Sequence, residues 1–209
     1  MDRPVKLFDL HPSPNNIKVR LALAFKKIPH ELIPVDPQNR EPLIKASGQS
    51  LTPVLLHGET VVYDSYAILR YLDANWPAPP RLFSEERERH KKIEEWEDFS
   101  RVECAPAVGM TFAQAIEGKV DPEKKKKANA LINRATVRIE SALAGSPCLM
   151  GDAPNAADFT VAPMIMYGAL SEEGAAANPW ARFFYDNLKI EGSPKTREWI
   201  GRIMEWDSK

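Results

Sequence analysis

Three small residues mark the place in this chain where chemistry is most easily built. Ser13, Pro14 and Asn15 directly follow a short apolar segment and directly precede a run with helical spacing. A serine hydroxyl and an asparagine amide both donate hydrogen bonds, and the amide does so without losing a proton. The first backbone N–H groups of a helix add donors and attract negative charge. Together these groups predict a site that binds an anion or a thiolate.

The segments around this turn predict a βαβ unit. Residues 5–10 alternate apolar and polar types as a strand does, and the apolar spacing from Ile17 onward is that of a buried helix face. Residues 30–35 predict a second strand, which a right-handed crossover lays parallel to the first. Pro34 leaves open whether this second strand is complete or forms only an edge.

A ββα unit follows and completes the first part of the chain. Residues 52–56 and 60–63 are strand-like and flank a turn, so they predict an antiparallel hairpin. A helix closes the unit, and either Asp64 or Ser65 can cap its first turn. The order βαβ then ββα predicts a sheet with some parallel pairs and with helices packed against it.

A proline-dense stretch separates this α/β part from a part without strands. Residues 77–81 read Pro-Ala-Pro-Pro-Arg, which cannot continue a helix and is stiff enough to fix one domain against another. We therefore predict an α/β domain at 1–77, a linker at 78–83 and an all-helical domain at 84–209. At the start of the helical domain, Ser84 is predicted to cap a long charged helix.

Two further helix starts stand out in the helical domain. Asp121 is followed by Pro122 at a first helical position, which predicts one helix. Asn155 and Asp158 match a variant of the capping box in front of an apolar run, which predicts a central buried helix. Pro163 is expected in the first turns of that helix, where proline is tolerated.

Composition and charge narrow the function. The 209 residues include 28 lysines and arginines against 29 acids, so no overall field favours nucleic acid or an anionic membrane as a partner. No apolar run reaches the about 18 residues of a membrane span, and we expect a cytoplasmic protein. Cys104 and Cys148 lie far apart and outside any CxxC pair, which predicts free buried thiols and no metal.

Four features, in their order and spacing, resemble the cytosolic glutathione transferase family over nearly the whole chain. They are Ser13-Pro14 with Lys18-Val19-Arg20, the segment Thr52-Pro53-Val54-Leu55, Asp64-Ser65, and Asn155 to Asp158. The resemblance implies a thioredoxin-like N-terminal domain that binds glutathione as co-substrate, followed by an all-helical substrate-binding domain. It also implies a homodimer, and the Ser-Pro-Asn turn is similar to a serine/asparagine-type bacterial branch.

The same resemblance implies roles for single residues. Ser13 donates a hydrogen bond to the glutathione sulfur, and Asn15 shares or takes over that role, so both are expected to be catalytic. The residues expected to bind glutathione are Gln49, Ser50, Thr52, Pro53, Asp64 and Ser65. A cis Thr52–Pro53 bond is expected to turn the main-chain groups of Thr52 toward the cysteinyl backbone. Ser50 departs from the family, which usually has glycine at this position.

Structural interpretations of these residues stay open. Ser13 and the Asp64-Ser65 pair also fit helix capping alone, and Pro53 fits an ordinary trans proline at a strand start. The resemblance nominates five side chains as contacts of an apolar second substrate, although core packing is the more usual role of such residues at helical spacing. These are His11, Trp96, Met110, Phe112 and Tyr167.

The predicted function is that of a glutathione transferase whose bound thiolate attacks an electrophilic carbon or a peroxide. A glutathione-dependent reductase or isomerase is the first alternative, and product analysis separates it from conjugation. A non-catalytic ligand-binding or interaction protein is the second alternative, because the same fold can serve without chemistry.

Overall fold

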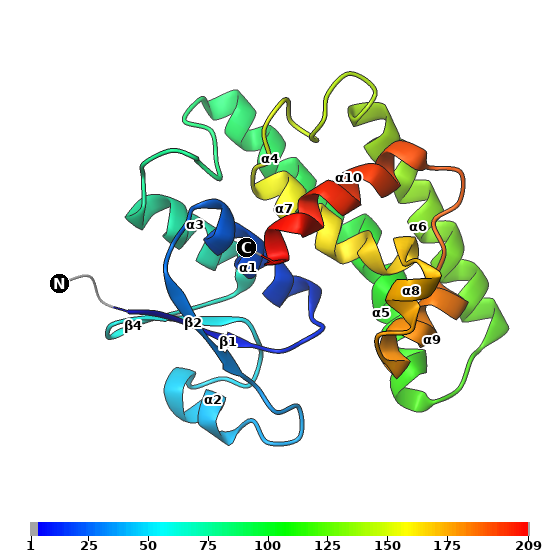
Figure 1. Cartoon of the computed structure of the whole chain (residues 1–209), viewed down its shortest axis with the longest axis horizontal. Coiled ribbons are helices and arrows are strands. Elements are labelled where there is room, and N and C mark those ends of the chain that lie inside the picture. Colours follow the sequence, from blue (N-terminus) through cyan, green and yellow to red (C-terminus); the bar gives the residue numbers. More distant parts are fainter. Residues whose placement is uncertain (1–3, 209) are drawn as a thin grey trace. The chain divides into compact units, whose positions relative to one another are not determined.

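The computed structural model describes residues 4–208, which fall into two compact units (Figure 1). The first unit contains the chain up to Glu86 together with the segment from Glu205, and the second contains Arg87–Met204. Within the part of the chain that is described, no helix is long and apolar enough to cross a membrane.

The first unit is a four-stranded sheet with helices on both faces. Its elements are β1 (Val5–Asp9), α1 (Pro14–Phe25), β2 (His30–Pro34), α2 (Glu41–Ser47), β3 (Val54–His57), β4 (Thr60–Tyr63), α3 (Ser65–Asn75) and the short 3-10 helix η3 (Glu205–Ser208). The strand order is β2-β1-β3-β4, with β1 and β2 parallel and the other neighbouring pairs antiparallel. In Figure 1, α1 and α3 lie on one side of the sheet and α2 on the other. The predicted thioredoxin-like fold is confirmed.

The edge strand β2 is complete. It pairs with β1 from His30 to Pro34, and the Val35 amide then donates to the Asp9 carbonyl at 2.8 Å. Proline is compatible with this place because an edge strand leaves one side of its backbone without a strand partner.

The hairpin differs from its prediction by a shift along β3. This strand begins at Val54 instead of Thr52 and continues to His57, so only Gly58 and Glu59 form the turn. Pro53 has no N–H to donate to a strand neighbour, which explains why pairing starts after it.

The helix α2 is absent from the sequence prediction. It has seven residues, of which only Leu43 is buried, so its apolar pattern is too short to show a helical period. Leu43 packs with Phe8 and Val54 in a small core beneath the sheet. This contact fixes α2 to the sheet face opposite α1.

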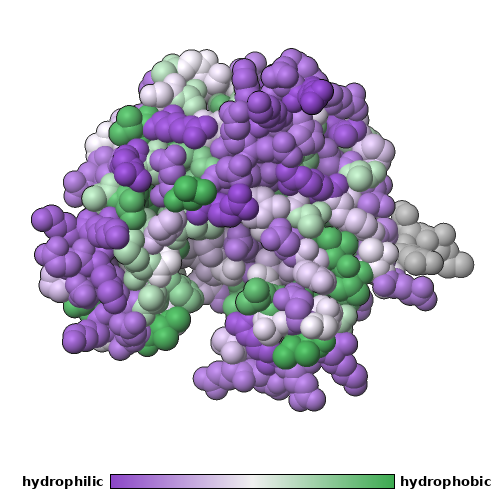
Figure 2. Space-filling model, turned by 180° about the vertical axis from the view of Figure 1, so that it is seen from behind, coloured by the Kyte–Doolittle hydropathy of each residue, from purple (hydrophilic) through white to green (hydrophobic). Residues whose placement is uncertain are grey.

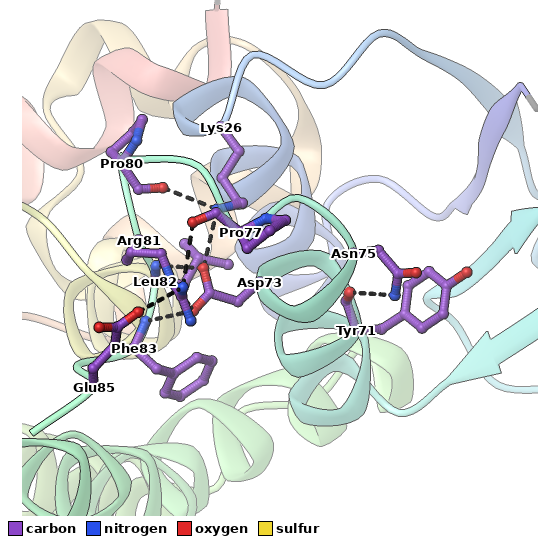
Figure 3. Close-up of polar contacts among 10 residues, drawn as sticks. All are labelled: Lys26, Tyr71, Asp73, Asn75, Pro77, Pro80, Arg81, Leu82, Phe83 and Glu85. Carbon is purple, nitrogen blue, oxygen red and sulfur yellow. Dashed lines mark hydrogen bonds and ion pairs between the residues drawn. The ribbon is translucent and has the colours of Figure 1, made fainter. Parts of the chain in front are cut away.

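One carboxylate of α3 anchors the end of the predicted linker (Figure 3). Asp73 accepts hydrogen bonds from the Leu82 and Phe83 amides at 2.9 and 3.2 Å, and it pairs with Lys26 at 3.0 Å and Arg81 at 3.2 Å. Burial alone acts to raise the pKa of Asp73, but the Leu82 amide and the Lys26 ammonium hold it below its ordinary value. The linker end belongs to the first unit, and the predicted domain bounds stay predictions.

The second unit is helical throughout its regular elements. These are α4 (Arg87–Phe99), the π-helical segment η1 (Ser100–Cys104), α5 (Ala105–Glu117), α6 (Pro122–Ala142), α7 (Ala156–Ile165), the 3-10 helix η2 (Met166–Ala169), α8 (Glu172–Ala175), α9 (Pro179–Asn187) and α10 (Pro194–Met204). All ten residues of α7 are buried, and it contacts α4, α5 and α10. The predicted central helix is confirmed, as is its capping box of Asn155 and Asp158.

Two helix predictions in this part of the chain are wrong in detail. The hydroxyl of Ser84 accepts from the Glu86 amide at 3.1 Å in a local turn, and α4 begins only at Arg87. Pro163 lies well inside α7 instead of in its first turns. Because proline has no N–H for the ladder, its place is consistent with the end of the α-helix two residues later, at Ile165.

Candidate functional site

The hydroxyl of Ser13 is not used to cap the helix that follows it. Ser13 is half-buried at the N-cap of α1, and its side chain makes no capping hydrogen bond. Its carbonyl accepts from the Asn16 and Ile17 amides, each at 3.0 Å, so the backbone alone begins the helix. This geometry does not support the interpretation of Ser13 as a simple cap, and it leaves a hydroxyl donor beside a helix N-terminus.

Asn16 fixes the turn that carries Ser13. Its side chain is fully buried, accepts from the Leu10 amide at 3.3 Å and donates to the Thr52 hydroxyl at 2.9 Å. The Ser13 amide also donates to the Leu10 carbonyl at 2.9 Å. Asn16 therefore joins the end of β1, the start of α1 and the segment before β3. The sequence analysis missed this role, since nothing in the sequence distinguishes the two neighbouring asparagines.

The Thr52–Pro53 bond is cis, as predicted. Pro53 is buried and leads directly into β3, whose Val54 pairs with Phe8 of β1. This antiparallel register brings Thr52 to the end of β1, where the Ser13 turn begins. Because the Thr52 hydroxyl is bound to Asn16, its main-chain groups are the ones suited to hold a ligand.

Asp64 and Ser65 lie at the start of α3 and make different contacts. Asp64 has a φ of 71°, and its carboxylate accepts from the Tyr66 and Ala67 amides at 2.8 and 3.4 Å, so it caps the helix. Ser65 is buried and its hydroxyl faces α1, where it lies 3.1 Å from the Lys18 ammonium and 3.5 Å from the Asn15 side-chain oxygen. The structure thus brings Asn15 and Ser65 together.

Gln49 and Ser50 are neighbours in the sequence, but their side chains have different environments. The Gln49 side chain donates to the Leu51 carbonyl and accepts from the Leu51 amide, both at 2.7 Å, which holds the loop in shape. Ser50 is exposed, and its carbonyl accepts from Arg40 at 2.9 Å. The Ser50 side chain is therefore open to solvent, whereas that of Gln49 is engaged with the loop.

Arg20 of α1 links β1 to η3, and the sequence did not predict this role. Its guanidinium binds Asp9, the last residue of β1, at 2.7 Å, and it holds Asp207 of η3 at 2.7 and 2.8 Å. Burial opposes the charge, but Asp207 and Asp9 hold the pKa of Arg20 above its ordinary value. These bonds fix β1 and α1 on either side of the Ser13 turn.

The residues predicted to contact a second substrate have unlike environments. Trp96 is buried with its ring 5.2 Å from Phe99, and Tyr167 is buried with its ring 4.5 Å from Phe184. Two other side chains of the set are accessible: Met110 is half-buried, and Phe112 is 42% exposed and stacked on Trp180 at 5.2 Å. His11 is exposed in the first unit, two residues before Ser13 in the sequence. Substrate contact by any of the five stays a prediction.

Both cysteines are free and buried, as predicted. Burial raises the pKa of the Cys104 thiol, and burial together with Asp158 raises the pKa of Cys148 to about 12. Neither thiol is a reactive thiolate at neutral pH. Thiol chemistry at the Ser13 turn therefore requires a thiol that is bound from solution.

Comparison with known proteins identifies relatives along most of the chain. A family model described as the glutathione S-transferase N-terminal domain matches residues 7–80. The chain is 31% identical over 180 residues to glutathione S-transferase Z1 of Arabidopsis thaliana, which covers 81% of this chain and 79% of that protein.

Solved structures agree on the fold. The tau class glutathione S-transferase of mango, Mangifera indica, superposes with a TM-score of 0.75 at 20% identity, over 96% of this chain and 88% of that one. Maleylacetoacetate isomerase from Anaeromyxobacter dehalogenans superposes with a TM-score of 0.72 at 20% identity, over 99% and 91% of the two chains.

Proposed function

This chain belongs to the glutathione S-transferase family, and on that premise we propose that it binds glutathione in its first unit and activates the thiol for reaction. Ser13 and Asn15 are the proposed catalytic residues. The proposed ligand contacts are Thr52 and Pro53 at the cysteinyl part, Asp64 and Ser65 at the γ-glutamyl part, and the loop of Gln49 and Ser50 at the glycyl part.

The observation that carries this proposal is the Ser13 hydroxyl, which makes no capping hydrogen bond at the start of α1. A free thiol has a pKa of about 8.5, and lowering it by about two units takes about 2.7 kcal/mol. A hydrogen bond to a charged group contributes about 1.5–3 kcal/mol, and a helix N-terminus contributes about 0.3–1 kcal/mol. Ser13 and α1 are therefore sufficient to keep the bound thiol ionised near neutral pH.

The thiolate then attacks an electrophilic carbon or a peroxide of an apolar second substrate. The protein holds the thiolate in place and lowers its pKa, while the bond-making atom belongs to glutathione. The Ser-Pro-Asn turn that supports this reading is also the feature that suggests the serine/asparagine-type branch.

Isomerisation is the second candidate, because one structural neighbour is a maleylacetoacetate isomerase. In such a reaction the thiolate adds to the substrate and leaves again, so that glutathione is regenerated. Incubation with glutathione and a panel of electrophiles, peroxides and cis-enone acids separates the candidates. Conjugates, oxidised glutathione or an isomer with unchanged glutathione are the three distinct products.

A non-catalytic carrier is the candidate from another class, and the polar set at the turn argues against it. A scaffold has no need of the Ser13 hydroxyl at the N-cap of α1, of the Asn15 amide two residues later, or of the Ser65 hydroxyl at the start of α3. A protein that binds glutathione without shifting its thiol pKa favours the carrier.

The Ser13→Ala variant tests the catalytic assignment. We expect turnover at neutral pH to fall about ten-fold or more, because one hydrogen bond to the thiolate is lost, and we expect the pH profile to move to higher pH. Ser141→Ala, an exposed serine of α6, is the matched control. Unaltered turnover of Ser13→Ala moves the catalytic role to Asn15, whose Asn15→Ala variant is then measured in the same assay.

A further inference from the structure

Lys18 lies inside α1, five residues after Ser13, and has no exposed surface. Its ammonium donates to the Ser65 hydroxyl at 3.1 Å and lies 3.5 Å from the centre of the Tyr66 ring. Burying an ammonium is costly unless polar groups compensate it, and a hydroxyl with an aromatic face provides part of that compensation. This lysine therefore places a positive charge directly behind Ser65.

The Ser65 hydroxyl donates only a long, weak hydrogen bond in the free protein. Since its oxygen accepts from an ammonium, the hydroxyl is polarised and becomes a stronger donor. Its own hydrogen bond goes to the Asn15 side-chain oxygen at 3.5 Å, whereas good O–H···O bonds measure about 2.7–2.8 Å. A better acceptor that enters the site can therefore accept the hydrogen bond of the Ser65 hydroxyl, and the free protein loses only the long contact to Asn15.

We propose that Lys18 is a positioning residue that acts through Ser65 and prepares its hydroxyl to bind the α-carboxylate of the γ-glutamyl group. The inference rests on the proposed function and adds a residue and a charge to it. The chain of donors runs from the Lys18 ammonium to the Ser65 oxygen, and from the Ser65 hydroxyl to the carboxylate. Asp64, which caps α3 beside Ser65, offers an opposite charge for the ammonium of the same group.

The test compares three ligands by calorimetric titration. Glutathione carries both charges of the γ-glutamyl group, 4-aminobutanoyl-cysteinylglycine lacks the α-carboxylate, and glutaryl-cysteinylglycine lacks the ammonium. In the Lys18→Met variant, we expect glutathione and the glutaryl ligand to bind about ten-fold or more weakly, and the aminobutanoyl ligand to bind as it does to wild type. Lys18→Arg keeps the charge and is expected to keep most of the discrimination.

A thermodynamic cycle shows whether Lys18 acts through Ser65. We expect Ser65→Ala to lose the same discrimination, and we expect Lys18→Met to cause no further loss in the Ser65→Ala background. Lys18→Gln, which keeps a donor without the charge, replaces Lys18→Met if that variant does not fold, and we expect it to lose the discrimination too. Circular dichroism of each variant checks the fold.

Four results overturn the proposal, and they differ from one another. Equal weakening of all three ligands in a folded Lys18 variant assigns the residue a purely structural role. Additive losses in the double variant exclude action through Ser65. A wild-type protein that binds no glutathione overturns the proposed function and this inference together, whereas binding with unchanged discrimination overturns only the inference.

Discussion

The Asp158 carboxylate is fully buried at the start of α7. It accepts hydrogen bonds from the amides of Leu149 and Asn155, at 2.9 and 3.1 Å, and from the Trp199 indole at 2.9 Å. These bonds favour the charged form, but burial outweighs them and raises the pKa of Asp158 from 3.8 to about 6. The folded protein therefore holds this proton more tightly than the unfolded chain does.

Asp158 therefore makes the folded protein more stable at low pH than at neutral pH. The contribution of Asp158 to stability is largest below about pH 4 and is lost as pH rises to about 6, on the order of 3 kcal/mol in all. Asp158→Asn lacks this titration, so wild type is expected to lose stability relative to the variant between pH 4 and pH 7. Urea unfolding of both proteins at pH 4 and at pH 7 gives the difference between their free energies of unfolding. If this difference is the same at the two pH values, the account is contradicted.

Single residues also show where sequence reasoning stops. The role proposed for Ser13 is predictable from sequence because it depends on a local strand-to-helix turn. The roles of Asn16 and Lys18 depend on burial against Thr52 and Ser65, which lie 36 and 47 residues away in the chain. A lysine within an amphipathic helix is normally assigned to the solvent face. Only the packing of α3 against α1 reveals that Lys18 is inside.

At the scale of elements, α1, α3 and the linker are held together by Asp73, as Figure 3 shows. The Asp73 side chain is 5% exposed and that of its partner Lys26 is 1% exposed. Removing one partner of such a pair leaves an uncompensated charge in the interior, which costs about 3–5 kcal/mol. Asp73 thus connects the C-terminal end of α3 to the C-terminal end of α1.

The Asp73→Asn variant is therefore expected to unfold about 3–5 kcal/mol more easily than wild type at pH 7. Because the pKa of Asp73 is lowered in the fold, its stabilisation is present above the ordinary carboxyl pKa and is lost as pH falls through the folded value. Glu85→Gln is the control, since Glu85 pairs with Arg81 at an 82% exposed position. Denaturant midpoints that shift equally in both variants count against a special role of Asp73.

Elements with strong periodic signals or caps are predictable, and the others are not. The Asn155 capping box and the Asp121 cap both lie where the sequence predicts them. The π-helical segment η1 has no sequence signal, because the change from one helical hydrogen-bond pattern to another leaves the apolar spacing nearly unaltered. The expectation that Pro163 lies in the first turns was wrong because α7 begins at Ala156, seven residues before it, and ends at Ile165.

At the scale of the whole molecule, the fold class follows from the sequence because strand patterns occur only in the first part of the chain. The βαβ then ββα order limits the first unit to few topologies, and long helical patterns without strands define the second. The second substrate is not predictable in this way. The side chains predicted to contact it include the exposed Phe112 and the buried Trp96 and Tyr167, and the sequence does not distinguish exposed from buried members of this set.

A cytoplasmic homodimer is the assembly that we propose from the family. The face in Figure 2 is largely hydrophilic, with apolar residues in small groups, and the net charge is −1. Sedimentation equilibrium is expected to give twice the chain mass of 23.5 kDa at micromolar concentration. A mass equal to one chain at every concentration refutes the dimer and leaves the glutathione site unaffected.

The most direct test of the central claim is a pH titration of the ultraviolet thiolate absorbance of glutathione bound to the wild-type protein, with free glutathione as reference. The account predicts a bound thiol whose pKa is about two units lower than that of free glutathione, because Ser13 and the start of α1 stabilise the thiolate. A bound thiol with an unshifted pKa, or no binding at all, contradicts it.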